Sequence, residues 1–466
     1  MKTHALHRIA LAAFAITAGS AAQAQNIERL AGASASQINV VRGLQNLCGG
    51  TFAVIKQTSS VSSLGNLITM TCSANFTGTS TNQVRMNVSG GTLSAVQSAA
   101  GLTGTAPVSL IDPSATSACT TLGAGTGPLS FLTAGQLINC GTTGQVSEFT
   151  NGGYMDVDGS IFRATGQTIP PEVDDSVDYP NSPFFQAFGL GISSALYNAL
   201  QAYQTAIGTL PSTCATSSVS GSVTTFTATG STLPGCQPSV AKAAITALMA
   251  SGNNQVKKAG ANALIDGTAS AKNGLSSTQA ISPDVPLKST VFYCRRPTTS
   301  GTQAGAQLYF LNNPTGTGEL GGQLVVVGSP TAPGTVNVGT TFTASTGSGT
   351  SDLKTCLNTN TYAVGLLSAE NNPIGGSDTY KFAKLNGAWI SEGVANSGQA
   401  AEAVAGRYDY VFQTVQFCHG GASSCTPILT ALSSAVPAGS SSPGLFLQTE
   451  SNFTRAKATT PYTAKP

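Results

Sequence analysis

The segment Ser289-Thr-Val-Phe-Tyr-Cys-Arg-Arg-Pro-Thr-Thr-Ser-Gly-Thr-Gln-Ala304 combines a strand-like apolar run, two adjacent arginines and a Ser-Gly-Thr turn. We expect the turn to open a helix, whose first backbone N–H groups lack partners within the helix. These donors and the positive end of the helix dipole commonly bind an anion, and an arginine adds a permanent charge and a planar fork. Only 9% of the residues are charged. The segment therefore predicts a strand–loop–helix unit with an anion cradle at residues 296–302.

The order strand, Ser/Gly turn and helix recurs nearer the N-terminus. Residues 83–88 have a strand pattern, residues 89–92 form a turn, and a helix is expected through residue 96. Such β–turn–α units favour a parallel sheet with its loops at one edge. Helical and strand patterns interleave through the chain, so we predict the α/β class. The C-terminal tail around residues 408–414 is predicted to be helix-rich.

Residues 1–24 have the pattern of a secretory signal peptide. Lys2 and Arg8 supply the positive start, a short apolar run follows, and Ala22-Gln-Ala24 is a small-residue cleavage site. The apolar run is too short to cross a bilayer, and no later run is long enough to do so. We therefore expect an exported protein with no membrane span.

Removal of Lys2 and Arg8 with the signal would leave 19 basic side chains against 19 acidic ones. A near-neutral chain argues against nucleic acid or an anionic membrane as the partner. Any specificity for an anion must then come from a local site.

All ten cysteines follow the predicted signal. An even number in an exported chain indicates disulfides formed in an oxidising compartment. Zinc is the alternative, but the sequence holds no Cys-x-x-Cys, so we favour disulfides. The sequence does not fix the connectivity. The simplest arrangement pairs consecutive cysteines along the chain: Cys48 with Cys72, Cys119 with Cys140, Cys214 with Cys236, Cys294 with Cys356, and Cys418 with Cys425.

Three serine-containing turns precede predicted helices, at Ser34, Ser89 and Ser300-Gly301-Thr302. Each alone is explained as an ordinary helix N-cap. Together with Arg296 and the strand-end Asp156 they could surround one tetrahedral oxyanion. Hydrogen phosphate can donate its proton to a carboxylate, whereas sulfate has none to donate, so a buried aspartate would favour phosphate.

Other chemistries find little support in the sequence. The loop that starts at Asp156 could suggest calcium, but Gln167 stands where an EF-hand needs glutamate. The Gly316–Gly321 stretch matches a dinucleotide fingerprint but precedes a strand-like segment. His419 is the only histidine after the signal, and no Gly-x-Ser-x-Gly elbow occurs. We therefore predict no catalytic residues, no metal and no cofactor.

At these residues the chain resembles the phosphate-binding members of the periplasmic solute-binding proteins, which have the two-lobed type 2 fold. The similarity runs intermittently over most of the mature chain, with insertions around residues 100–150 and 210–235. Residues 296–302 are the most specific match, because they are similar to the family's Arg-x-x-x-Ser-Gly-Thr anion loop. The other similar segments are residues 27–34, 88–91, 153–156, 187–192, 237–240 and 362–368.

The resemblance implies a ligand set for phosphate. Asp156 would accept the phosphate proton and Arg296 would pair with the anion. The whole implied set is Ser34, Ala35, Ser89, Asp156, Arg296, Ser300, Gly301 and Thr302. Ala35 stands where the family usually has an aromatic residue, and Thr298 where an acidic partner of the arginine is common.

The resemblance also implies an architecture of two lobes joined by a hinge, each a mixed sheet flanked by helices. Lobe I would comprise residues 25–190 plus 365–466, and lobe II residues 191–364. The implied function is capture of phosphate or a related oxyanion in the interlobe cleft. The protein would act as a non-enzymatic monomer, periplasmic or secreted, and could deliver the ligand to an ABC transporter permease. The alternative is an exported structural or adhesive protein that keeps the fold without a transport ligand.

Overall fold

The structure is a computed structural model of the whole chain. It describes residues 27–157, 159–164, 167–173, 178, 181–250, 254–266, 274–311, 334–337, 341–394, 401–419, 425–435, 445–447, 453–454 and 463–464. The predicted signal peptide and the Gly316–Gly321 turn lie outside the described residues.

Strands and helices interleave along the described chain, as the sequence indicated. The strands are β1 (Ile27–Gly32), β2 (Phe52–Lys56), β3 (Leu67–Cys72), β4 (Gln83–Asn87), β5 (Val108–Ile111), β6 (Thr120–Thr121), β7 (Leu137–Asn139), β8 (Gln145–Glu148), β9 (Gly152–Met155), β10 (Asn181–Ile192), β11 (Ala215–Ser220), β12 (Val223–Ala228), β13 (Ser239–Val240), β14 (Gln279–Ser282), β15 (Val291–Arg295), β16 (Gly334–Asn337), β17 (Phe342–Thr346), β18 (Ala363–Ser368), β19 (Lys381–Leu385), β20 (Val411–Cys418), β21 (Leu445–Leu447), β22 (Phe453–Thr454) and β23 (Thr463–Ala464). The helices are α2 (Gln37–Leu47), α3 (Ser94–Gln97), α4 (Gly159–Ala164), α5 (Ser194–Ala206), α6 (Lys242–Met249), α7 (Gln255–Ala259), α8 (Asn262–Asp266), α9 (Gly301–Leu311), α10 (Thr350–Thr359), α11 (Ala401–Val404) and α12 (Thr426–Ala435).

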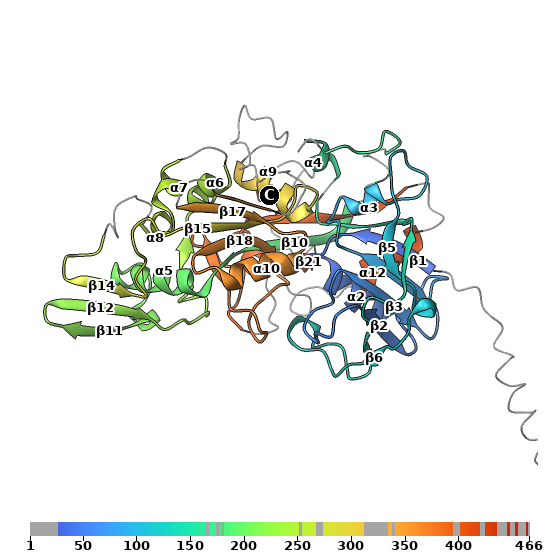
Figure 1. Cartoon of the computed structure of the whole chain (residues 1–466), viewed down its shortest axis with the longest axis horizontal. Coiled ribbons are helices and arrows are strands. Elements are labelled where there is room, and N and C mark those ends of the chain that lie inside the picture. Colours follow the sequence, from blue (N-terminus) through green and yellow to red (C-terminus); the bar gives the residue numbers. More distant parts are fainter. Residues whose placement is uncertain are drawn as a thin grey trace, which may run out of the picture.

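The long strand β10 joins two sheets into one path. In the first sheet β1 lies parallel between β4 and β9, and β20 pairs with both β9 and β10. In the second sheet β15 lies parallel between β17 and β18, and β18 pairs with the second half of β10. Figure 1 shows the result as two lobes, one around β1–β4 and one around β15, β17 and β18. The α/β class and the two-lobed arrangement are confirmed. The lobe boundaries stay a prediction.

Each lobe buries an apolar helix face against its sheet. In α2 the residues Val41 and Leu44 are fully buried, and they share a cluster with β3, β4 and α12. The apolar residues of α2 recur at helical spacing, which is why the sequence alone indicated this helix. A larger cluster holds α5, α9, β10 and β18 together and runs from one lobe into the other. The lobes therefore share packing at β10.

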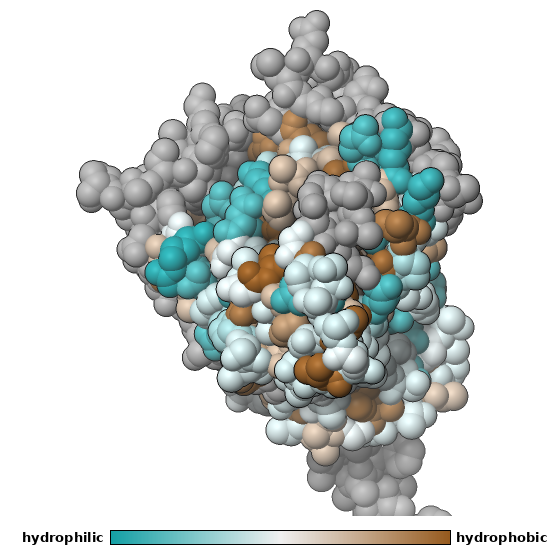
Figure 2. Space-filling model, turned by 90° about the vertical axis from the view of Figure 1, so that its left-hand side faces the viewer, coloured by the Kyte–Doolittle hydropathy of each residue, from teal (hydrophilic) through white to brown (hydrophobic). Residues whose placement is uncertain are grey.

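The small sheet β11–β12–β14 projects from the end of the second lobe (Figure 1). Five of the six residues of β11 are exposed, and the hairpin is rich in serine and threonine. Figure 2 faces this end, where pale surface of intermediate hydropathy surrounds separate apolar patches. Among the described residues, no helix is both long and apolar enough to cross a bilayer.

The expected helix-rich tail around residues 408–414 is wrong. The structure places Val411–Cys418 in strand β20, between β9 and β10. Seven consecutive residues of β20 are buried, so both faces are covered and the period-two pattern of a half-exposed strand is missing. Ser239 belongs to the short strand β13, and helix α6 begins at Lys242.

All five predicted disulfides are present. The structure bonds Cys48–Cys72, Cys119–Cys140, Cys214–Cys236, Cys294–Cys356 and Cys418–Cys425. The Cys294–Cys356 bond ties β15 to α10 across 62 residues of sequence, and the Cys418–Cys425 bond spans only 7. Disulfides of this number are typical of exported proteins.

Loss of the Cys294–Cys356 disulfide and loss of the Cys418–Cys425 disulfide should have unequal effects on stability. A cross-link restricts the unfolded chain more when it closes a longer loop. We expect replacement of Cys294 and Cys356 by serine to lower the free energy of unfolding by about 4 kcal/mol. The same change at Cys418 and Cys425 should cost about 2 to 3 kcal/mol. Urea denaturation measures both, and equal losses would contradict the chain-entropy explanation.

Candidate anion-binding site

Three helix N-termini meet where the two lobes touch. The Ser34 loop leads into α2 on one side, and α9 and α10 begin on the other. Ser34 Oγ lies 2.9 Å from Thr350 Oγ1, so hydroxyls 316 residues apart share a hydrogen bond. Each helix N-terminus carries a partial positive charge, and three in one place favour a negative guest.

Arg296 lies at the centre of this contact and is only 2% exposed. Its Nη1 donates to Thr350 Oγ1 at 2.8 Å and to Ser34 Oγ at 3.2 Å, and its Nη2 donates to the Ser348 carbonyl at 3.3 Å. Its Nε has no hydrogen-bond partner among the described residues. Burial lowers the pKa of Arg296 to about 10, so the guanidinium is still a cation at neutral pH. It brings a buried positive charge with one donor unused.

Asp156 follows β9 directly and is also 2% exposed. Its Oδ2 accepts from Thr92 Oγ1 at 3.2 Å and from Thr302 Oγ1 at 3.4 Å. Its Oδ1 has no partner within the described part of the chain. Burial raises the pKa of Asp156 to about 6, against the opposing effect of the Arg296 charge. Above that pH the site offers one open carboxylate acceptor.

The raised pKa of Asp156 predicts a pH-dependent stability. The folded pKa of about 6 lies above the ordinary carboxyl value, so between these two values the folded state binds more protons than the unfolded state. Stability of the ligand-free protein should therefore fall as pH rises from about 4 to about 6. The pKa of Glu370 is raised in the same direction by burial and by Asp156. Asp156→Asn should flatten the fall in Tm over this range, and an unchanged slope would contradict the assignment.

Gly301 allows the lobes to approach closely. Its N–H donates to Thr92 Oγ1 at 3.0 Å, and a Cβ added there would lie 2.4 Å from that oxygen and 2.8 Å from Asp156 Cβ. On the facing loop Gly91 has φ +72°, and a Cβ there would lie 3.0 Å from the Thr299 carbonyl oxygen. Both positions require glycine for the lobes to meet around the site.

Gly301→Ala should weaken anion binding at least tenfold while the protein stays folded. The added methyl would push Thr92 and Asp156 away, whereas the first turn of a helix accepts alanine readily. Calorimetric titration with phosphate measures the affinity. Gly123→Ala is the control, since a Cβ there meets no atom within 4 Å. Equal affinities for the two variants would contradict the close approach.

The structure brings together five of the eight residues that the resemblance implied. Ser34, Asp156, Arg296, Gly301 and Thr302 all take part in the contacts above. Ser300 is buried at the start of α9, where its backbone N–H donates to the Pro297 carbonyl. Ala35 packs into the apolar core.

Ser89 lies apart from this group. It is exposed, its hydroxyl donates to Asn87 Oδ1 at 2.6 Å, and it lines a different cavity beside Gln145. The residue of the same turn that reaches Asp156 is Thr92, three positions further on. Two glycines separate them, and they let the turn present the later hydroxyl.

Thr350 was missed in the sequence, although a signal was present. The triplet Ser348-Gly349-Thr350 repeats the Ser-Gly-Thr of the predicted anion loop, and it opens α10 as the other opens α9. Asp352 fixes this loop by accepting from Ser348 N at 2.8 Å and Gly349 N at 3.1 Å. The negative charge of Asp352 also raises the pKa of Arg296, against the lowering by burial. Thr298 accepts a hydrogen bond from Gln167 Nε2 at 3.1 Å.

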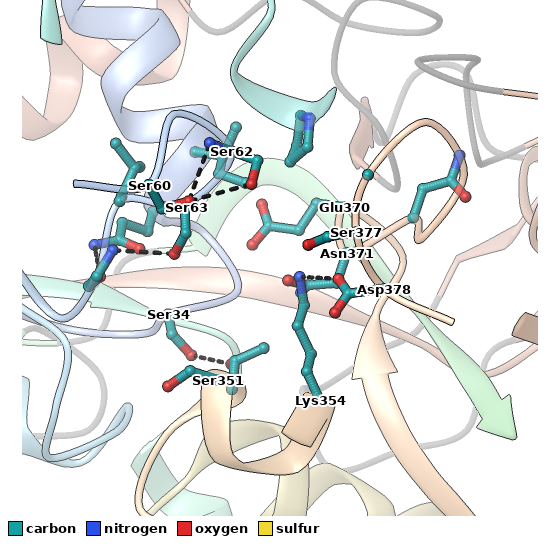
Figure 3. A pocket seen from close by; sticks show the side chains of 18 of the residues that line it. Ser34, Ser60, Ser62, Ser63, Ser351, Lys354, Glu370, Asn371, Ser377 and Asp378 are labelled. Carbon is teal, nitrogen blue, oxygen red and sulfur yellow. Dashed lines mark hydrogen bonds and ion pairs between the residues drawn. The ribbon is translucent and has the colours of Figure 1, made fainter. Parts of the chain in front are cut away.

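A polar cavity of about 250 Å³ lies beside this contact, and Ser34 and Thr350 line it. Figure 3 shows its walls, from the Ser60–Ser63 loop of one lobe to α10 of the other. In the described ranges, no cluster of three His, Cys, Asp or Glu residues could hold a metal ion.

Among the solved structures that this chain is similar to are two phosphate-binding transport proteins, both of low similarity. One is the crystal structure of an ABC-type phosphate transport receptor from Vibrio cholerae, at 11% identity and TM-score 0.26, covering 56% of this chain and 70% of that one. The other is a putative phosphate ABC transporter substrate-binding protein with bound phosphate from Clostridium perfringens, at 10% identity and TM-score 0.29, covering 60% and 79%. No protein-family profile and no curated protein matches the chain. With TM-scores below 0.5, function must be inferred from the site itself.

Proposed function

We propose that the protein is an exported, non-enzymatic binding protein that captures phosphate or a related tetrahedral oxyanion between its lobes. One observation carries the proposal: Arg296 and Asp156 lie in one buried interlobe cluster, and each keeps a polar atom that has no partner among the described residues. Leaving a buried polar atom without a hydrogen bond is costly. A guest that accepts from the guanidinium and donates to the carboxylate would satisfy both.

Hydrogen phosphate has this combination of groups. Its oxygens can accept from Arg296, from the hydroxyls of Ser34 and Thr350 and from the helix N-termini, while its P–OH donates to Asp156. Sulfate carries no proton and would face the carboxylate with two acceptors together. The buried cation and charge-assisted bonds offset the cost of removing water from the anion.

The wider setting fits an exported carrier. Five disulfides suit an oxidising compartment, such as the periplasm or the extracellular space. A monomer whose lobes close over the anion could present it to an ABC transporter permease, as the sequence resemblance implies. No cofactor is needed for this role.

A second candidate is an exported structural or adhesive protein without a transport ligand. One observation favours it: the Arg296 guanidinium already donates to the hydroxyls of Ser34 and Thr350, which also bond each other. The contact between the lobes could thus be purely structural.

Calorimetric titration of phosphate-free protein at pH 7.5 separates the two candidates. The binding role predicts saturable heat with phosphate, a rise in Tm, and no heat with equimolar sulfate. Absence of heat and of any thermal shift at millimolar phosphate would refute it and leave the structural role.

A further inference from the structure

The polar cavity beside the anion site is larger than a bare oxyanion requires. Its volume of about 250 Å³ is many times the space of roughly 10–15 Å³ that one water molecule needs. Residues from both lobes form its walls, among them Ser60, Ser62 and Ser63 from one lobe and Ser351 and Lys354 from the other (Figure 3). A part of a ligand other than the anion could occupy it.

The cavity adjoins the hydroxyl groups that contact Arg296. Ser34 and Thr350 line the cavity, and both hydroxyls also accept hydrogen bonds from Arg296 Nη1. Glu370 lies on the opposite wall with its carboxyl directed into the cavity (Figure 3), and Asp156 is near enough for its charge to raise the pKa of Glu370. The cavity and the cluster around Arg296 and Asp156 are therefore neighbours.

The walls of the cavity are polar and carry little net charge. Lys354 Nζ lies 3.1 Å from Asp378 Oδ2, so these two charges pair with each other. Glu370 is 2% exposed, and burial together with the Asp156 charge raises its pKa well above the ordinary value, which disfavours its charged form. Asn39 Nδ2 lies 3.5 Å from Glu370 Oε2, and Asn39 Oδ1 has no partner among the described residues.

The lining defines which chemical group fits. Hydroxyls and amides make up most of it, and no aromatic side chain is among the described residues that line the cavity. A nucleobase would lack a stacking surface, and a second charge would lack a free counter-ion. A small uncharged group with several hydroxyls would find donors and acceptors on every side.

We propose that the ligand is an organic phosphate monoester whose small hydroxylated carbon group occupies this cavity. The proposal rests on the proposed function, because the phosphoryl group sits at Arg296 and Asp156. The ester oxygen points towards Ser34 and Thr350, whose mutual hydrogen bond opens to admit it. A monoester monoanion keeps one P–OH, which donates to Asp156 as in hydrogen phosphate.

Calorimetry at pH 6 with glycerol 3-phosphate, inorganic phosphate and glycerol tests the proposal. We expect wild-type protein to bind the monoester at least tenfold more tightly than inorganic phosphate, and glycerol not to bind. Ser377→Trp fills the cavity from an exposed loop, and Thr355→Trp fills it from the exposed face of α10. Each should weaken the monoester at least tenfold and leave inorganic phosphate within twofold of wild type. Ser222→Trp, in the exposed β11–β12 turn, is the control.

The outcomes are distinguishable. If phosphate binds but the monoester binds no better, or if both filled variants keep the monoester affinity, the cavity proposal is overturned and the oxyanion site stands. If neither phosphate nor monoester binds the wild-type protein, both proposals fail. Melting curves of the two filled variants verify that at least one is folded before titration.

Discussion

Replacement of Arg296 by alanine is expected to lower phosphate affinity at least a hundredfold. The side chain is buried, is charged at neutral pH and keeps Nε free of a partner within the described residues. A charge-assisted hydrogen bond contributes roughly 1.5–3 kcal/mol, so loss of two such bonds costs on the order of two decades or more. Calorimetric titration with phosphate at pH 7.5 measures the change.

Three further arginine variants serve as controls for the Arg296→Ala result. Arg296→Lys keeps the charge but not the planar fork, so its affinity should lie between wild type and Arg296→Ala. Arg407 has an exposed side chain that pairs with Glu402, and Arg407→Ala should bind phosphate like wild type. We expect Arg295→Ala to affect affinity less than Arg296→Ala. If a folded Arg296→Ala protein bound phosphate as tightly as wild type, Arg296 would not be a ligand of the anion.

The preference for phosphate over sulfate should shrink as pH falls through about 6. Above this value Asp156 is ionised, accepts the proton of hydrogen phosphate and repels sulfate. Below it the carboxyl is protonated and can donate to either anion. Competition titrations at pH 5, 6 and 7.5 should therefore show strong discrimination only at the highest pH.

Asp156→Asn should remove this pH dependence. The amide can donate to sulfate at every pH, so the variant should bind sulfate at pH 7.5 where the wild-type protein does not. We expect the ratio of the two affinities to fall at least tenfold. A variant that still rejects sulfate would mean that another group sets the selectivity.

The part of the site formed by one continuous segment, from β15 to the start of α9, could be predicted from the residue types of that segment alone. The strand β15, the loop with Arg296 and the start of α9 at Gly301 follow from an apolar run, a proline and a Ser-Gly-Thr turn. The disulfides were predictable for a similar reason, because each joins a cysteine to the next cysteine along the chain.

The remaining part depends on contacts between distant segments. Thr350 meets Ser34 across 316 residues, and only the folded lobes bring their loops together. Within one turn, the sequence favoured Ser89, yet the backbone at Gly91 presents Thr92 to Asp156. The sequence pattern of strand β20 does not indicate a strand, because burial on both faces removes the alternation that marks one. Tertiary context decided each of these positions.

Crystals grown with millimolar arsenate would show whether a tetrahedral oxyanion binds between the lobes, since arsenate is tetrahedral, carries a proton as phosphate does and scatters anomalously. We expect an anomalous peak between the lobes, within hydrogen-bond distance of Arg296 and of Asp156 Oδ1. Crystals with no peak there, or with peaks only on the outer surface, would contradict it.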